Sequence, residues 1–260
     1  MPIKIATPIS HLFEKTKFAN AIAAESDFLE CRDRSIEFNS FINKQILFHC
    51  ELQPIHELSN KDWDYLKKIR NEKPFLKLIS FHIASCYDKP EIRNHMFFKG
   101  GKRYLKSEML QNARNNFSKI KALFGPNVKI CVENNNYYPT EAYDVVTDPD
   151  FISQIVIDND INFLFDIAHA RVTCFNRKLD FDNYKSQLPL SRLSQIHICT
   201  YGIKEDESIA YDAHNIPNDE ELEEVRANII KSPDEIYLTV EYYGDVAKLK
   251  ESLNKVRELV

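Results

Sequence analysis

The chain alternates short apolar, β-branched runs with stretches whose apolar residues recur at helical spacing. Eight of these runs predict strands, at Ile3–Pro8, Phe28–Cys31, Ile46–Cys50, Leu76–Ile83, Lys129–Glu133, Asn162–Asp166, Gln195–Ile198 and Ile236–Glu241. Strands that alternate with helices over 260 residues are typical of one parallel barrel. We therefore expect a single α/β domain over residues 1–260 that folds as a (β/α)8 TIM barrel.

The stretches between the predicted strands carry helix start and stop signals. Ser59-Asn-Lys-Asp62 predicts a capping box that opens a helix through Arg70, and Thr147-Asp-Pro149 predicts a helix with Pro in its first turn. Further helices are expected at Leu12–Ala24, Lys102–Phe124, Asn218–Lys231 and Asp245–Val260. The longest irregular stretch, residues 84–101, follows the fourth strand, so we expect it over the catalytic end of the barrel.

Composition excludes several classes of protein. At 43% hydrophobic and 28% charged residues, the chain has the composition of a packed globular protein. It has only 5 glycines and no GxGxxG or GxxxxGK[ST] motif, which argues against a dinucleotide or phosphate loop. No apolar run approaches the roughly 20 residues that span a bilayer, and the first residues do not resemble a signal peptide. We therefore expect a cytoplasmic protein without a membrane partner.

The cysteines and the net charge indicate the redox state of the thiols and the kind of partner to expect. The six cysteines form no CxxC pair, and most lie in apolar runs, so we expect free, buried thiols. A formal net charge of −5 makes nucleic acid an unlikely partner in bulk. The one basic cluster, at Lys99, Lys102, Arg103 and Lys106, is interpreted as the solvated start of the long helix.

Residues that bind metals follow six consecutive predicted strands. Barrel enzymes build their active sites at the carboxyl ends of the strands. Six strands end on or beside such a residue, in order His49, His82, Glu133, Asp166, His197 and Glu241, and three more lie close by, at His169, Asp212 and His214. We predict that all nine converge on one rim.

The charge of this set predicts bound cations. Glu133, Asp166, Asp212 and Glu241 could not be buried side by side without them. Two or three divalent ions would balance the four carboxylates. Mixed imidazole and carboxylate ligands suit zinc, iron(II), manganese or cobalt, so the ligand types alone do not separate hydrolytic zinc from redox iron.

Several segments resemble one family of barrel enzymes. The order of the nine residues is similar to that in the xylose-isomerase-like superfamily, and to endonuclease IV in particular. Within that superfamily, the flanking segments resemble the multinuclear non-heme iron oxidases. These segments are DFLECRD near residue 30, VENNNY at 132–137, IHICTYG at 196–202, DAHNIP at 212–217 and LTVEYYGD at 238–245.

The resemblance implies a ligand partition and a reaction. One metal would take His49, His82 and Glu133; a second would share Glu133 with Asp166, His197 and Glu241; a third would take His169, Asp212 and His214. Asn134 would orient the site or contact the substrate. The implied cofactor is two or three iron ions, with zinc or manganese as the alternative. The implied reaction is the O2-dependent oxidation of a ribosomally made peptide, often at Cys or Asp, presented by a leader-binding partner protein.

Three other functions remain open from the sequence. A zinc-dependent phosphodiesterase of the endonuclease IV type fits the nine ligands but not the acidic pI of about 5.9. A sugar isomerase or epimerase of the same barrel class needs fewer metals than this set provides. A metal-storing module is the non-enzymatic alternative, and it would react with neither oxygen nor a phosphodiester.

Overall fold

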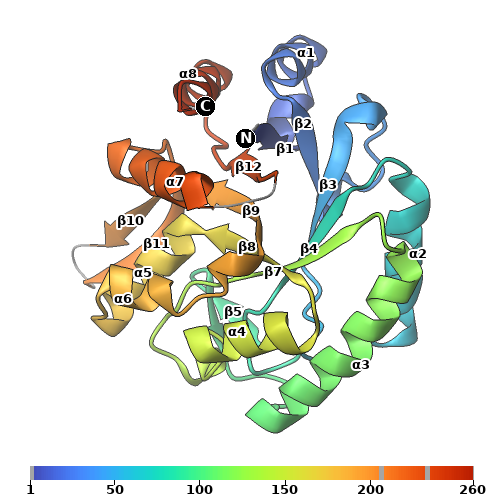
Figure 1. Ribbon diagram of the computed structural model, residues 1–260, viewed down its shortest axis with the longest axis vertical. Coiled ribbons are helices and arrows are strands. Elements are labelled where there is room, and N and C mark those ends of the chain that lie inside the picture. Colours follow the sequence, from blue (N-terminus) through green and yellow to red (C-terminus); the bar gives the residue numbers. More distant parts are fainter. Residues whose placement is uncertain (1–2, 205–207, 232–234, 260) are drawn as a thin grey trace.

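Eight parallel strands form a closed barrel at the centre of the computed structural model, which describes residues 3–204, 208–231 and 235–259 (Figure 1). The barrel strands are β1 (Lys4–Pro8), β2 (Phe28–Arg32), β3 (Gln45–Cys50), β4 (Leu78–His82), β7 (Lys129–Glu133), β8 (Asn162–Asp166), β9 (Leu193–Ile198) and β12 (Tyr237–Val240). Each strand pairs with the next barrel strand along the chain, and β12 closes the barrel against β1. All eight predicted strands and the predicted TIM barrel are confirmed.

Helices cover the outside of this barrel (Figure 1). They are α1 (Thr16–Glu25), α2 (Asn60–Glu72), α3 (Lys106–Phe124), α4 (Pro149–Asp158), α5 (Ile167–Arg177), α6 (Phe181–Ser186), α7 (Asp219–Lys231) and α8 (Val246–Arg257). The predicted capping box is present, because the Ser59 N–H donates to the Asp62 carboxylate at 2.7 Å and the Asp62 N–H donates back to the Ser59 hydroxyl. Pro149 occupies the first turn of α4 as predicted.

Some helix boundaries differ from the prediction. The segment predicted as one helix at Leu12–Ala24 is a 3-10 turn, η1 (His11–Phe13), followed by α1. The long helix begins at Lys106 rather than Lys102, because Tyr104 donates its N–H to the carbonyl of Cys86 and residues 102–104 continue the loop. The last helix ends at Arg257, and Val260 lies outside the described residues.

Helices α5 and α6 were not predicted. Asp166 is both the last residue of β8 and the N-cap of α5, where its carboxylate accepts the N–H of His169 at 2.7 Å. No turn residues separate the two elements, so the change of periodicity from strand to helix has no loop to mark it. His169 therefore lies in the first turn of a helix, directly above the barrel strand that carries Asp166.

Two hairpins extend from the barrel. The stretch predicted to be irregular, residues 84–101, contains the antiparallel pair β5 (Glu91–Arg93) and β6 (Met96–Phe98). The pair β10 (Thr200–Lys204) and β11 (Ile209–Asn215) follows β9. Asp212 and His214 were predicted in a loop, but they lie on β11. The second hairpin exists because the chain turns back after β9 before it enters α7.

The barrel interior changes from apolar to polar along the strands. An apolar layer contains Ala6, Leu47, Leu78, Cys131 and Leu164, which pack together and are fully buried. Side chains of a strand alternate between its faces, so residues two positions further on point the same way. Those positions hold His49, Ser80, Glu133 and Asp166, all of them buried. Within the barrel, the strands thus place a layer of polar side chains next to a layer of apolar side chains, on the side of the carboxyl ends.

Two other expectations can be compared with the structure. All six cysteines are free and buried, as predicted. Among the described residues, no helix is long and apolar enough to cross a membrane.

Candidate metal centre

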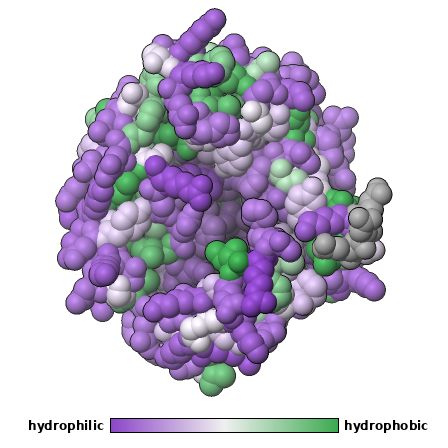
Figure 2. Space-filling view, turned by 180° about the vertical axis from the view of Figure 1, so that it is seen from behind, coloured by the Kyte–Doolittle hydropathy of each residue, from purple (hydrophilic) through white to green (hydrophobic). Residues whose placement is uncertain are grey.

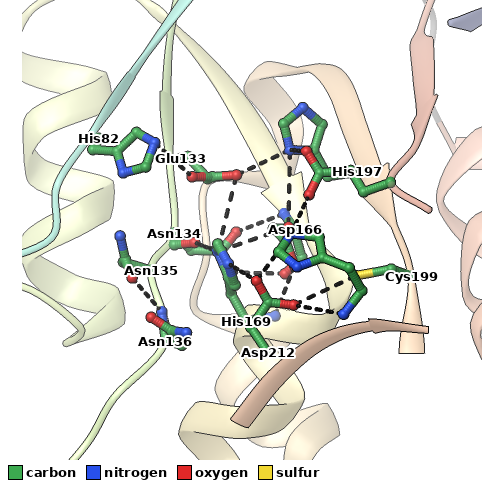
Figure 3. Close-up of polar contacts among 12 residues, drawn as sticks. His82, Glu133, Asn134, Asn135, Asn136, Asp166, His169, His197, Cys199 and Asp212 are labelled. Atoms are coloured by element: carbon green, nitrogen blue, oxygen red, sulfur yellow. Dashed lines mark hydrogen bonds and ion pairs between the residues drawn. The ribbon is translucent and has the colours of Figure 1, made fainter. Parts of the chain in front are cut away.

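The structure brings all nine predicted metal ligands together at the carboxyl end of the barrel, and Figure 3 shows most of them. A chain of contacts between 2.6 and 3.7 Å connects the set in the order His82, His49, Glu133, His197, Glu241, His214, Asp212, His169 and Asp166. Six of the nine come from barrel strands or the residue after one, and three from α5 and β11. Their role as ligands stays a prediction, whereas their convergence is a fact of the fold.

Two imidazoles face one carboxylate on the β3, β4 and β7 side of the site. The Nε2 atoms of His49 and His82 lie 2.6 Å apart, and they are 3.6 and 3.8 Å from Oε2 of Glu133. Ser80 contacts Nδ1 of His49 at 2.8 Å, which turns Nε2 of that ring into the site. The strand register brings two of these residues together, since His82 on β4 is paired with Glu133 on β7.

His197 lies at the middle of the site. Its Nδ1 atom is 3.1 Å from Oε1 of Glu133, 3.0 Å from Oε1 of Glu241 and 3.8 Å from Oδ2 of Asp166. Glu133 therefore presents one carboxylate oxygen to His197 and the other to the pair of His49 and His82 (Figure 3). A carboxylate with this placement is suited to bridge two metal ions.

The third group combines a helix with the second hairpin. Oδ2 of Asp212 lies 3.4 Å from Nε2 of His169 and 3.1 Å from Nε2 of His214. His214 also contacts Glu241 at 3.1 Å, which connects this group to His197. Asn176 on α5 holds β11 in place, because its side-chain amide makes hydrogen bonds of 2.8 and 3.0 Å with the N–H and carbonyl of Ala210.

Asn134 acts on the backbone of the site. Its amide accepts the N–H of Asp166 at 2.9 Å and donates to the carbonyl of the same residue at 2.8 Å. The backbone carbonyl of Asn134 contacts Nδ1 of His169 at 3.0 Å, so Nε2 of that ring is the nitrogen turned toward Asp212. Since Asn134 is completely buried, its position fits an orienting residue and not a substrate contact.

Burial and mutual charge shift the pKa values of the site in opposite directions. Burial and the neighbouring carboxylates of Glu133, Glu241 and Asp212 raise the pKa of Asp166 to about 7, although His169 opposes them. Burial would raise the pKa of Glu241 as well, but Arg32 and His197 outweigh it and hold that pKa well below its usual value.

The pKa values of the histidines are also shifted in opposite directions. Burial and the charge of Arg32 lower the pKa of His49, whereas His197 has its pKa raised because Glu241 and Glu30 outweigh burial. Acid and base forms therefore coexist in one buried cluster near neutral pH, which is characteristic of functional sites.

Several buried polar atoms of the site make no hydrogen bond within the described part of the chain. They include Oε2 of Glu133, Oδ2 of Asp166 and Nδ1 of His197. Buried polar atoms are normally satisfied, so these three call for a partner. Compact groups that could hold an ion are His49, Glu133 and His197; Glu133, Asp166 and His169; and Glu30, His197 and Glu241. The donor set and its free lone pairs fit divalent metal ions with imidazole and carboxylate preference.

Glu30 and Arg32 belong to the site although they were not predicted there. Both lie on β2, and Glu30 is completely buried. Oε2 of Glu30 lies 2.9 Å from Nε2 of His197, and Arg32 makes ion pairs with Glu30 at 2.7 Å and with Glu241. A Glu and an Arg two residues apart in the apolar strand run would have been the available sequence signal, because such charges rarely enter a strand interior without partners.

Two clefts reach the cluster from the surface. The face shown in Figure 2 has a central hollow that is surrounded mainly by hydrophilic residues. One cleft of about 540 Å³ is bordered by Asp212 and His214 and by the tip of the first hairpin at Asn94, His95 and Met96. Residues 84–101 therefore do lie over the catalytic end, as predicted. The other cleft, about 630 Å³, is lined among others by Phe13, Arg32, Arg34 and Tyr243.

Two of the four residues of the predicted basic cluster are engaged in ion pairs. Lys102 pairs with Glu57 at 3.1 Å, and Arg103 pairs with Asp144 at 2.7 Å. Both side chains are exposed at the start of the α3 region, as the solvated interpretation expects. Neither cation is available to hold a phosphate without losing an acidic partner.

Comparison with solved structures supports the fold. The chain is similar to a xylose isomerase-like TIM barrel protein from Mycobacterium smegmatis in complex with magnesium, with a TM-score of 0.61 and 10% identity over 99% of this chain and 96% of that one. It is also similar to the 3-keto-D-glucoside 4-epimerase YcjR of E. coli, with a TM-score of 0.59 and 12% identity over 99% of this chain and 100% of that one. At these identities, the likeness concerns the fold alone.

Curated relatives are distant. A UPF0276 protein of Acaryochloris marina is 21% identical over 154 residues, which are 59% of this chain and 54% of that protein. A UPF0276 protein of Vibrio parahaemolyticus is 24% identical over 91 residues, which are 34% of this chain and 32% of that protein. The chain thus matches about half the length, or less, of these relatives.

A family comparison gives the strongest assignment. The model of the RiPP precursor modification enzymes MbnB/TglH/ChrH, which act on ribosomally made peptide precursors, matches residues 55–260. That range contains β4 and all later barrel strands, and eight of the nine clustered residues lie in it, His49 being the exception. The chain belongs to the MbnB/TglH/ChrH family of RiPP precursor modification enzymes.

Proposed function

We propose that this protein is a multinuclear iron-dependent oxidase that uses O2 to modify a ribosomally synthesised peptide at a Cys or an Asp residue. The peptide substrate follows from the family. The observation that carries the metal-dependent part is the placement of Glu133, whose two carboxylate oxygens face His197 at 3.1 Å and His49 at 3.6 Å. Its buried Oε2 accepts no hydrogen bond from the residues that the structure describes, as expected of an atom that awaits a cation.

The clustered residues form groups that would hold two or three metal ions. His49, His82 and Glu133 would hold the first ion, and Glu133, Asp166, His197 and Glu241 the second. His169, Asp212 and His214 would hold a third, through Nε2 atoms that already lie within 3.4 Å of the Asp212 carboxylate. When bound, iron(II) supplies electrons to O2 and an open position for a substrate heteroatom.

The remaining contributions come from the chain itself. Asn134 holds Asp166 through its backbone, and Ser80 orients His49, so two of the ligands are positioned before any ion arrives. The carboxylates of Glu133, Asp166, Asp212 and Glu241 carry four negative charges, which two divalent ions would neutralise. Arg32 balances the additional charge of Glu30.

The clefts provide room for a peptide on both sides of the cluster. The cleft beside Asp212 and His214 and the cleft beside Arg32 and Tyr243 both border the site, so a peptide chain can reach the cluster from the solvent. We propose that a leader-binding partner protein presents the peptide here, since clefts of about 540 and 630 Å³ hold a few residues of a peptide and not a whole leader.

The decisive experiment is elemental analysis of protein purified without added metal, together with a Mössbauer spectrum. We expect two or three irons per chain and a mixed-valent signal. Incubation with O2 and short precursor peptides encoded near the gene should then change the peptide mass at Cys or Asp. Stoichiometric zinc without iron would contradict the proposal. Cleavage of an abasic-site oligonucleotide that EDTA abolishes would then assign the site to phosphodiester hydrolysis.

A further inference from the structure

Glu30 is a fully buried carboxylate behind the metal cluster. Its Oε2 atom lies 2.9 Å from Nε2 of His197, accepts the hydroxyl of Thr239 at 3.1 Å and accepts the side-chain amide of Gln195. Its Oε1 atom forms an ion pair with Arg32 at 2.7 Å. All of these partners lie on barrel strands, on β2, β9 and β12, so the carboxylate is held from three sides.

This contact decides which nitrogen of His197 faces the cluster. An ionised carboxylate only accepts hydrogen bonds, so Nε2 of His197 must carry the hydrogen. Nδ1 then points to the opposite side, where Oε1 of Glu133 and Oε1 of Glu241 lie at 3.1 and 3.0 Å. Nδ1 is buried and donates no hydrogen bond to any residue that the structure describes, so its lone pair can face a cation between these carboxylates. A carboxylate behind an imidazole is the usual arrangement for a metal-bound histidine, because it fixes the ring and makes it a stronger ligand.

We infer that Glu30 is a positioning residue that fixes His197 as an Nδ1 ligand, while Arg32 ties Glu30 to the ligand Glu241. The inference deepens the proposed function, since it rests on a metal ion bound by His197 and Glu241. The carboxyl end of β2 carries none of the nine predicted ligands. With Glu30 as a positioning residue, this strand also has a role in the site. Arg32 bridges the two carboxylates and keeps them from repelling each other.

A direct ligand role for Glu30 is the competing assignment. Glu30, His197 and Glu241 do have ligand atoms close enough for one ion. However, Oε2 of Glu30 already has three donors, and Oε1 faces the guanidinium of Arg32. A cation at Glu30 would have to displace these donors and approach Arg32. Oε1 of Glu30, Oε2 of Glu133 and Oδ2 of Asp166 all lack a hydrogen bond among the described residues, but only Oε1 of Glu30 is paired with a guanidinium.

The test compares Mn²⁺ binding by wild type and Glu30→Gln in the full chain. Glutamine keeps an acceptor for His197 but loses the charge. In titrations with Mn²⁺, EPR gives the concentration of the free ion. The affinity of one binding step should be about 10–100-fold weaker in the variant. Glu221→Gln is the matched control: it also neutralises a fully buried carboxylate, one that binds Thr200 and the N–H of Asn218 and none of the nine residues, and it should leave every step unchanged.

A second measurement separates positioning from mere structural support. In Zn²⁺-loaded protein with ¹⁵N-labelled histidine, His197 should show a metal-bound Nδ1 and a protonated Nε2, with assignment by His197→Gln. In Glu30→Gln the Nε2 proton should exchange faster with solvent while the other histidine signals stay in place. These signals do not depend on catalytic activity.

The outcomes are distinct. If wild type binds Mn²⁺ and Glu30→Gln binds it with the same affinity in every step, the inference about Glu30 fails and the proposed function stands. Manganese coordinated directly by Glu30 in an anomalous map would also overturn it. If wild type binds no divalent metal at all, the proposed function fails first and this inference fails with it.

Discussion

The side-chain amide of Asn134 holds both backbone groups of Asp166, accepting its N–H at 2.9 Å and donating to its carbonyl at 2.8 Å. The two residues lie at the ends of neighbouring strands, β7 and β8, and Asp166 is also the N-cap of α5. One side chain therefore fixes the point where a barrel strand ends and the helix that carries His169 begins. A backbone clamp of this kind sets ligand geometry without occupying a coordination position.

Replacing Asn134 should destabilise the protein. Asn134→Ala removes one hydrogen bond from the buried N–H of Asp166 and one from its carbonyl, so we expect a loss of about 2–5 kcal/mol and a Tm lower by roughly 5–15 °C. Thermal unfolding followed by circular dichroism measures both. Asn135→Ala, which removes only a local bond to the N–H of Asn136, should cost about 1 kcal/mol. Equal losses of stability in the two variants would show that the hydrogen bonds between Asn134 and Asp166 stabilise the protein no more than a local bond does.

Removing the shared carboxylate should empty more than one metal position. Glu133→Gln takes away the group that faces both His197 and the pair of His49 and His82. We expect bound metal to fall to one ion per chain or fewer and peptide oxidation to fall at least 100-fold. Elemental analysis gives the first value. Glu57→Gln changes an exposed glutamate and should keep full metal; full iron in Glu133→Gln would count against the shared carboxylate.

The Asn176 clamp should control the hairpin that carries Asp212 and His214. Asn176→Ala removes two hydrogen bonds to Ala210 on β11. We expect faster amide exchange across residues 209–215, measured by mass spectrometry, and weaker binding of one metal ion, because two ligands of that ion lose their fixed position. Asn115→Ala on the exposed face of α3 serves as the control. Unchanged exchange in the hairpin would assign its rigidity to other contacts.

His56 makes stability dependent on pH outside the metal centre. Burial lowers the pKa of His56, whose Nε2 contacts the carbonyl of Ser85 at 2.9 Å and whose ring stacks on Tyr104. Below pH 6.5 the unfolded chain takes up a proton at His56 that the folded chain does not, so acid favours unfolding. The contribution is therefore fully present above the ordinary histidine pKa of 6.5 and is lost as the pH falls below it, with a slope of at most about 1.4 kcal/mol per pH unit.

Urea unfolding at several pH values measures this slope. The free energy of unfolding of wild type should fall more steeply between pH 7.5 and 5.5 than that of His56→Gln, whose amide does not titrate. Other histidines contribute equally to both proteins, so the difference between them isolates His56. Parallel pH profiles for the two proteins would mean that His56 titrates normally in the folded state.

The barrel could be predicted because its signals are local. Each strand is a short apolar run, and helix start signals such as the N-cap Ser59 and the first-turn Pro149 lie within one turn of the helix start. Strand ends in a parallel barrel meet on one rim whatever their order, so the convergence of the six polar residues at or beside strand ends could be predicted from the sequence. The boundaries that failed, such as the start of α3, depend on contacts with distant loops.

The helix α5 and the hairpin that carries Asp212 and His214 were decided by tertiary structure. Asp166 ends a strand and caps a helix at once, so the sequence contains no turn to separate them. The second hairpin is bound through Ala210 to Asn176, which lies 34 residues away in the chain. A sequence shows which side chains can make such a bond but not which of them meet.

The sequence by itself determined the fold class, the alternation of elements and the set of residues that end the strands. These depend on periodicity and residue type, which act over a few positions. Only the tertiary structure decided which side chains surround Glu133, and that Glu30 lies behind His197. Glu30 and His197 are 167 residues apart, and their contact arises because closing the barrel brings β2 and β9 to face the same interior. Contacts between groups so far apart in the chain depend on the whole fold, because every strand between them must be in register first.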